Sequence, residues 1–363
     1  MRAMKNLMQN KSKSTNFVTF LVVIVAYAVM QLLYSFDVLS NSMKGQLIPI
    51  CSYIVLAVSL NLVVGISGEL SLGHAGFMGV GAFTGIVAAT VAQSVVGNPI
   101  LRLVIAMIAG GIMAGIMGGL IGIPVLRLRG DYLAIVTLAF GEILKNIISN
   151  LYVGLDADGL RVALSEEGVR LADGGKMILS GPLGATGVTK IASFPVGFIL
   201  ILFTLFVILN IVNSKEGRAI KAIRDNRIAA ESVGINVMTF KMKAFVLSAF
   251  LAGMAGALYG LNYSSIMASK FNFNTSINIL IYVVLGGMGN ILGSVISATV
   301  LYILPEAMRG LEDYRMIIYA VVLIVVMLCT WSPKIKGVLA VVGDNVKNSV
   351  AKLFKKEVTG HEG

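Results

Sequence analysis

Charged side chains are scarce in this sequence. Asp, Glu, Lys and Arg together make up 13% of the 363 residues, whereas 57% of the residues are hydrophobic and the mean hydropathy is +0.88. A soluble domain of this length needs far more polar surface to cover its core. The composition therefore excludes a soluble globular protein.

Cysteine and histidine are nearly absent too. Cys51 and Cys329 lie far apart inside apolar runs, so we predict neither a disulfide framework nor a metal cluster. His74, at a predicted helix end, favours a packing or interfacial role, and His361 falls in a polar tail. Because the carboxylates do not cluster either, no metal centre, triad or acid/base pair emerges, and we predict that the chain is not an enzyme.

A phosphate-binding loop is also missing. The glycine-rich stretches GVGAFTG and GGMGN do not follow a soluble strand, and neither leads into GK[ST]. We therefore expect this chain to bind no cofactor. Any ATP that it uses must be bound by another subunit.

Long apolar runs dominate what is present. A helix of about 20 residues crosses a hydrocarbon core of about 30 Å, so these runs predict an all-α, polytopic transmembrane bundle of about ten spanning or partly spanning helices. The first run exceeds a signal-peptide core and lacks a small-residue cleavage site, so we expect a retained helix. The predicted helices lie near 17–35, 46–66, 75–95, 103–123, 132–153, 195–212, 244–263, 276–285, 291–308 and 315–331.

Basic residues predict the orientation of the bundle. The net charge is +11, but most of the 29 Lys and Arg residues stand in short clusters beside apolar runs, which favours orientation over nucleic-acid binding. The positive-inside rule then puts both termini in the cytoplasm. We expect a cytoplasmic tail at 1–16, a permease domain at 17–332 and a basic cytoplasmic tail at 333–363.

Two connections between the apolar runs are long. Residues 154–194 are rich in glycine and mixed in charge, and the topology puts them outside, as either a small cap or a flexible loop. Residues 214–243 lie inside and predict two short helices. Asp225 or Asn226 can cap the second of these, and Gly234 suits the left-handed residue that ends it. This second helix is either a docking element or an ordinary solvated interfacial helix.

Glycines recur at helical spacing within the apolar runs. Small residues let helix backbones approach closely in a bilayer, where no hydrophobic force drives helices together. The pattern therefore predicts tight packing. The positions assigned to it are Gly73, Gly76, Gly81, Gly85, Gly256, Gly260, Gly289 and Gly293.

The fifth apolar run carries unusually polar residues. A lysine at the bilayer centre costs about 2.5 to 3.5 kcal/mol on insertion scales, so intramembrane charges are functional candidates. Glu142 and Lys145 are three residues apart and can pair on one helical face. Thr137, Glu142 and Asn146 are accordingly candidates for a translocation path, and structural pairing is the competing interpretation.

Several long motifs resemble one family of transporters. These are SGELSLGHAGFMGVGAFTG at 67–85, LRLRGDYLAIVTLAFGEI at 126–143, GRAIKAIRDNRIAAESVGINVMTFKMKAFVLSAFLAGMAGALYG at 217–260 and GGMGNILGSVISA at 286–298. They occur in the order found in the LivM-type permease subunits of branched-chain amino-acid ABC importers. The resemblance covers roughly residues 46–331.

The resemblance implies a set of partners in a bacterial-type plasma membrane. These are a LivH-like permease subunit across the path, two ABC ATPase subunits inside and a substrate-binding protein outside. It also implies that 224–234 couples the chain to the ATPases. The residues assigned to this coupling are Arg224, Asp225, Asn226, Ala229, Ala230, Glu231 and Gly234.

Alternatives remain at this stage. Urea and amide permeases of the same superfamily share much of these motifs. An ion-coupled secondary transporter would take up substrate in a sodium or proton gradient without an ATPase, and Glu142 keeps that possibility open. A non-transporting scaffold would show no flux under either condition.

Overall fold

The computed structural model describes residues 2–36, 41–128, 130–156, 159–169 and 175–307, with three further positions, 320, 321 and 324. The chain divides into two compact units, Met1–Tyr302 and Ile303–Gly363. The predicted basic tail at 333–363 lies outside the described residues, as does nearly all of the predicted helix at 315–331.

The described helices coincide with nine of the ten predicted apolar helices. The first begins at Arg2, so the predicted tail at 1–16 is continuous with it. The helices are α1 (Arg2–Ser35), α2 (Asn41–Asn61), the π-helical turn η1 (Leu62–Ile66), α3 (His74–Val91), α4 (Pro99–Val125), α5 (Asp131–Ser149), α6 (Phe194–Asn213), α7 (Lys215–Asp225), α8 (Arg227–Ser232), α9 (Val237–Gly260), α10 (Phe273–Gly286) and α11 (Ile291–Ala307).

Six described helical segments are long and apolar enough to cross a membrane, namely Met43–Ile66, His74–Ser94, Pro99–Val125, Asp131–Ser149, Phe194–Asn213 and Val237–Gly260. Thr19–Ser35, Phe273–Gly286 and Ile291–Pro305 are shorter apolar helices. The α10 helix has 14 residues, fewer than the roughly 20 that cross a hydrocarbon core. The chain is a multi-pass membrane protein.

The centre of the bundle is formed by α3, α4 and α9, whose backbones come very close. A Cβ atom added to Gly81 would lie 2.1 Å from the Gly253 carbonyl oxygen, and one added to Gly256 would lie 2.0 Å from that of Met78. At Gly85 it would lie 2.5 Å from the Ala257 Cβ. Glycine is therefore required sterically where α3 crosses α9.

The remaining glycines of the predicted packing set lie at further points of close approach and at one turn. Gly73 and Gly76 face α5, where an added Cβ would lie 2.4 Å from the Thr137 carbonyl oxygen and 2.8 Å from the Gly141 Cα. A Cβ added to Gly260 would lie 3.2 Å from the Ala82 Cβ, again where α3 crosses α9, and one added to Gly293 would lie 1.8 Å from the Gly286 carbonyl oxygen. Gly289 differs, because it lies in a turn with φ of +84°.

A small antiparallel sheet interrupts the helical fold. Its strands are β1 (Tyr152–Asp156), β2 (Gly159–Ala163), β3 (Lys176–Ser180), β4 (Ala185–Thr186) and β5 (Ser265–Ile266), in the spatial order β2-β1-β3-β4-β5. The expected all-α fold is thus right for the apolar runs but misses this sheet. The long connection at 154–194, predicted as a cap or a flexible loop, contains folded β structure.

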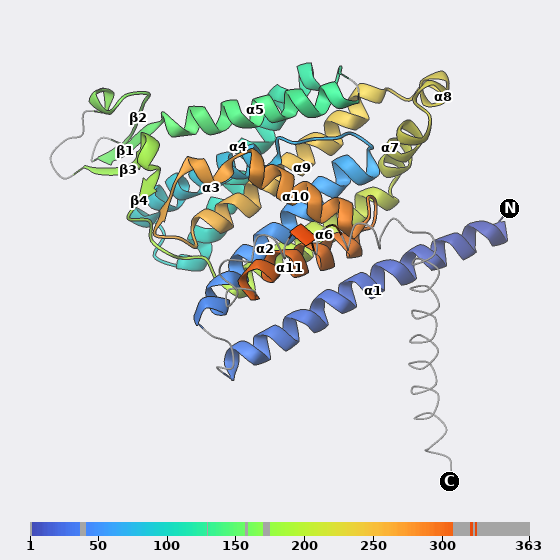
Figure 1. Cartoon of the computed structure of the whole chain (residues 1–363), viewed down its shortest axis with the longest axis horizontal. Helices are drawn as coiled ribbons and strands as arrows, with labels where there is room; N and C mark the ends of the chain where they lie inside the picture. Colours follow the sequence, from blue (N-terminus) through green and yellow to red (C-terminus); the bar gives the residue numbers. More distant parts are fainter. Residues whose placement is uncertain are drawn as a thin grey trace, which may run out of the picture. The chain divides into compact units, whose positions relative to one another are not determined.

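The sheet and the α7–α8 pair lie at opposite ends of the helices in the first unit (Figure 1). The α5 helix runs between them, since it ends at Ser149, three residues before β1 begins at Tyr152 (Figure 1). The spanning helices therefore separate two differently built ends, one with a sheet and one with two short polar helices.

Candidate functional site

The segment that is predicted to couple this chain to ATPases comprises α7, α8 and the turn to Asn236. We call it the coupling segment, and it is ordered by its own caps. The Asn226 backbone N–H donates to the Ala222 carbonyl oxygen at 3.0 Å at the end of α7, and its side-chain Oδ1 accepts the Ala229 N–H at 3.0 Å at the start of α8. Asp225, the other predicted cap, is the last residue of α7, and its carboxylate lies 3.3 Å from the Arg224 Nη2. Asn226 is therefore the residue that fixes the start of α8.

One face of α8 packs against α7 and α9, and the opposite face is exposed. Ala230 is buried against Ile223 of α7 and Val237 of α9. By contrast, the Ile228 side chain is 77% exposed and that of Val233 is 76% exposed. The six-residue helix α8 and the residue that follows it thus expose two large aliphatic side chains on one small surface.

The end of α8 is a tight turn at Gly234. This residue has φ of +82°, and its N–H donates to the Glu231 carbonyl oxygen at 3.0 Å. The Ile235 N–H donates to the Ala230 carbonyl oxygen at 3.1 Å, which returns the chain toward α9. Nothing crowds a Cβ at Gly234, so the left-handed backbone alone favours glycine there.

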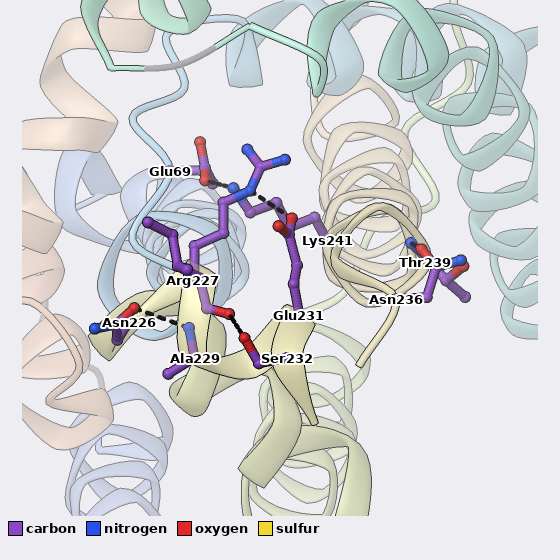
Figure 2. A network of polar contacts seen from close by, with 10 residues as sticks. Glu69, Asn226, Arg227, Ala229, Glu231, Ser232, Asn236, Thr239 and Lys241 are labelled. Atoms are coloured by element: carbon purple, nitrogen blue, oxygen red, sulfur yellow. Dashed lines mark hydrogen bonds and ion pairs between the residues drawn. The ribbon is translucent and has the colours of Figure 1, made fainter. Parts of the chain in front are cut away.

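Ion pairs stabilise α8 and the neighbouring start of α9. Lys241, near the start of α9, pairs with Glu69, and both side chains are largely buried. Within α8, the Arg227 Nε donates to Glu231 Oε1 at 2.9 Å. Figure 2 shows these pairs around the Asn226 cap. Breaking the Glu69–Lys241 pair would leave a buried charge unpaired, so it is the costlier of the two to lose.

A hydrogen bond connects the coupling segment to the end of α2. The Nη1 of Arg224 donates to the Gly65 carbonyl oxygen, within the π-helical turn η1, at 2.8 Å. Nearby on α7, burial and the Arg224 guanidinium lower the pKa of Lys221, whose Nζ donates to the Val212 carbonyl oxygen at 3.3 Å. The segment is thus tied to the bundle through basic side chains that donate to backbone carbonyls.

The three candidates for a translocation path on α5 occupy different surroundings. The buried Thr137 hydroxyl donates to the Ala134 carbonyl oxygen and accepts the Leu72 N–H at 3.0 Å. Glu142 pairs with Lys145 and also accepts the Phe273 N–H at 3.0 Å. Asn146 is exposed. Thr137 and Glu142 therefore hold neighbouring segments to α5, and the structure does not bring the three onto one surface.

His74 packs inside the bundle. Its Nε2 lies 2.9 Å from the Ser59 Oγ, and the side chain is buried. Within the part of the chain that the structure describes, no three His, Cys, Asp or Glu residues come together as a metal site would need.

Sequence reasoning passed over Asn61, Glu69 and Lys241. Asn61 is fully buried within a membrane-length helix and makes hydrogen bonds to three residues around the α10–α11 turn. A signal for it was available, since a polar amide inside an apolar run is costly and marks a contact. No local signal could pair Glu69 with Lys241, because they are 172 positions apart.

Membrane-length helices packed on glycine, with two short capped polar helices at one end, fit a polytopic membrane transport subunit. The chain belongs to the family described as "Branched-chain amino acid transport system / permease component", which matches residues 42–327.

Named relatives agree with this family. The chain is 33% identical over 292 residues to the high-affinity branched-chain amino acid transport system permease protein LivM of Escherichia coli K12, covering 78% of this chain and 67% of that protein. It is 32% identical to the LivM protein of Salmonella typhimurium LT2, over 86% of this chain and 72% of the relative. A probable LivM of Methanocaldococcus jannaschii is 25% identical over 121 residues, which cover 32% of this chain and 35% of that protein.

Proposed function

We propose that this chain is the LivM-type permease subunit of an ATP-driven importer and forms half of a path for branched-chain or related hydrophobic amino acids. Its family and the function for which its relatives are named support the substrate class. The observation that carries the mechanism is the coupling segment, a capped helix with a bare apolar face and a direct bond from Arg224 to the Gly65 carbonyl oxygen.

The residues of the coupling segment divide into two roles. Ile228, Ala229 and Val233 are exposed and provide the surface onto which an ATPase subunit docks. Ala230 is buried and anchors α8 to α7 and α9. Movement of a docked ATPase would therefore move α8 as a unit and reach the bundle through these anchors.

The proposal includes partners that this chain needs for transport. A LivH-like permease would complete the path, two ABC ATPase subunits would bind and hydrolyse ATP, and an extracytoplasmic binding protein would deliver substrate. We place both termini and the coupling segment in the cytoplasm of a bacterial-type cell, because basic clusters flank the helices on that side. The small sheet then lies outside, at the end where a binding protein would arrive.

Substitutions in α8 test the coupling role. Ala230→Arg would force a charge between α7 and α9, and Gly234→Arg would strain the left-handed turn. We expect both to abolish ATP-dependent leucine uptake in reconstituted vesicles while the protein still inserts. Ser232→Ala is the control, since the Ser232 hydroxyl only donates to Ile228 of its own helix. Normal uptake by the Ala230 and Gly234 variants would refute the coupling assignment.

Competition experiments test the substrate class. We expect unlabelled valine and isoleucine to compete with labelled leucine, and urea and short amides to leave leucine uptake unchanged. Strong competition by urea or amides, with weak competition by valine, would instead favour a urea or amide permease. That alternative shares the fold and the coupling segment, so only substrate measurements separate the two.

A further inference from the structure

The junction between α2, the coupling segment and the turn before α11 is built around one asparagine. We call it the Asn61 junction, and its members are Asn61, Gly65, Arg224, Gly289, Asn290 and Ser294. The proposed function assigns a role to the coupling segment alone. It leaves open how movement of that segment would reach helices that do not touch it.

The first observation is the π-helical turn at the end of α2. In η1 the Ser67 N–H donates to the Leu62 carbonyl oxygen at 3.0 Å, five residues back. π-helical turns are rare and occur frequently at functional sites. Here the Gly65 carbonyl oxygen within the turn accepts the Nη1 of Arg224.

The second observation is that the Asn61 side-chain amide forms hydrogen bonds with a segment more than 220 residues away in the sequence. Its Oδ1 accepts the Gly289 N–H at 2.8 Å. Its Nδ2 donates to the Ser294 Oγ at 2.8 Å and to the Asn290 carbonyl oxygen at 3.1 Å. The side chain is fully buried. Both functional atoms of this amide therefore hold the α10–α11 turn against α2.

The third observation is steric. A Cβ on Gly65 would lie 1.8 Å from the Asn61 Oδ1 and 2.2 Å from the Gly289 nitrogen. A Cβ on Gly68 would lie 2.6 Å from the Arg224 Cγ. The Gly289 turn has φ of +84°, so glycine is favoured on both sides of the contact. The junction thus brings the Gly65 and Gly289 backbones together and leaves no space there beyond the Asn61 and Arg224 side chains.

We propose that Asn61 and Arg224 are positioning residues that join the coupling segment to the α10–α11 turn through the Gly65 peptide, so that the three move as one unit. This inference rests on the proposed function. Arg224 connects α7 to Gly65 in η1. Asn61, directly before η1, connects α2 to the turn before α11 and to the start of α11. Displacement of α8 reaches the interior of the bundle along this route.

Uptake per ATP hydrolysed is the quantity that tests the junction. The complex of this chain with its permease partner, ATPases and binding protein is reconstituted, and leucine uptake and ATP hydrolysis are measured together. We expect Asn61→Ala and Arg224→Gln each to lower uptake per ATP at least tenfold while ATP hydrolysis continues and the ATPases still co-purify. Because Asn61 is fully buried, its effect cannot come from direct contact with an ATPase.

Two further variants sharpen the test. The double variant should be no worse than either single one, since both break the same connection. Asn150→Ala is the control, because the Asn150 amide donates only within α5, to the Asn146 carbonyl oxygen. Wild-type uptake per ATP in Arg224→Gln, a change at a partly exposed side chain, would overturn the proposal. Absence of ATP-driven uptake by the unaltered complex would overturn the proposed function instead.

Discussion

The side-chain oxygen of Asn226 accepts the backbone N–H of Ala229 at 3.0 Å and thereby starts the short helix α8. Replacing a capping asparagine by alanine costs about 1 kcal/mol of helix stability. We therefore expect Asn226→Ala to loosen α8, measured as faster amide hydrogen exchange at 227–234, and to reduce ATP-driven uptake.

The chain offers a matched control for this cap. Asn236 caps α9 in the same way, accepting the Thr239 N–H at 3.2 Å. Because α9 is long and packed in the bundle, Asn236→Ala should leave uptake nearly unchanged. Equal loss of uptake in the two variants would show that α8 has no special role.

The Glu69–Lys241 ion pair fixes the start of α9 to the loop after η1. Both side chains are largely buried, so removing one partner strands the other charge at a cost of about 3–5 kcal/mol. We expect Glu69→Gln and Lys241→Met each to lower the thermal unfolding midpoint in detergent. The double variant Glu69→Leu with Lys241→Met should recover much of the loss, and a double variant as unstable as the single ones would argue against pairing.

Because the backbones of α3 and α9 are in close contact, we expect that adding even one methyl group at a glycine between them destabilises the fold. Gly81→Ala would place its Cβ 2.1 Å from the Gly253 carbonyl oxygen. Overpacking of this kind costs about 1–3 kcal/mol or more. We expect much less folded Gly81→Ala protein by size-exclusion chromatography. Gly119→Ala is the control, as its nearest neighbour would be the Val246 Cγ2 at 3.8 Å, and poor folding of that variant would remove the steric explanation.

Glu142 provides a test between a structural and a pathway role. Its carboxylate pairs with Lys145 and accepts the Phe273 N–H, and a hydrogen bond to a charged group contributes about 1.5–3 kcal/mol. Glu142→Gln keeps an oxygen for the Phe273 N–H and loses the charge. We expect a lower unfolding midpoint with leucine uptake retained. Lost uptake at unchanged stability would place Glu142 on the translocation path.

The apolar helices could be predicted because the composition of each continuous run reflects burial in a membrane. The run predicted at 195–212 is almost entirely apolar, and α6 occupies Phe194–Asn213. The capped helix at Asn226 and the turn at Gly234 were visible as well, since caps and left-handed turns depend on neighbouring residues. Glycine spacing indicated which faces pack, without indicating their partners.

Contacts between distant segments could not be predicted in this way. The sheet was missed because its strands are five residues or shorter and β5 comes from Ser265–Ile266, far along the chain from β4. The Asn61 amide reaches Gly289, and Arg224 reaches Gly65, and neither pairing has a local pattern. The polar residues of α5 suggested one surface, whereas Thr137 and Glu142 hold different neighbouring segments.

The energy source is the most direct test of the central claim that this chain transports only through docked ATPases. Labelled leucine uptake is measured in vesicles holding the full complex, with ATP inside and no ion gradient, and in vesicles holding this chain alone under a sodium or proton gradient. The account predicts uptake in the first case, lost with Ala230→Arg, and none in the second. Gradient-driven uptake by the chain alone would contradict it.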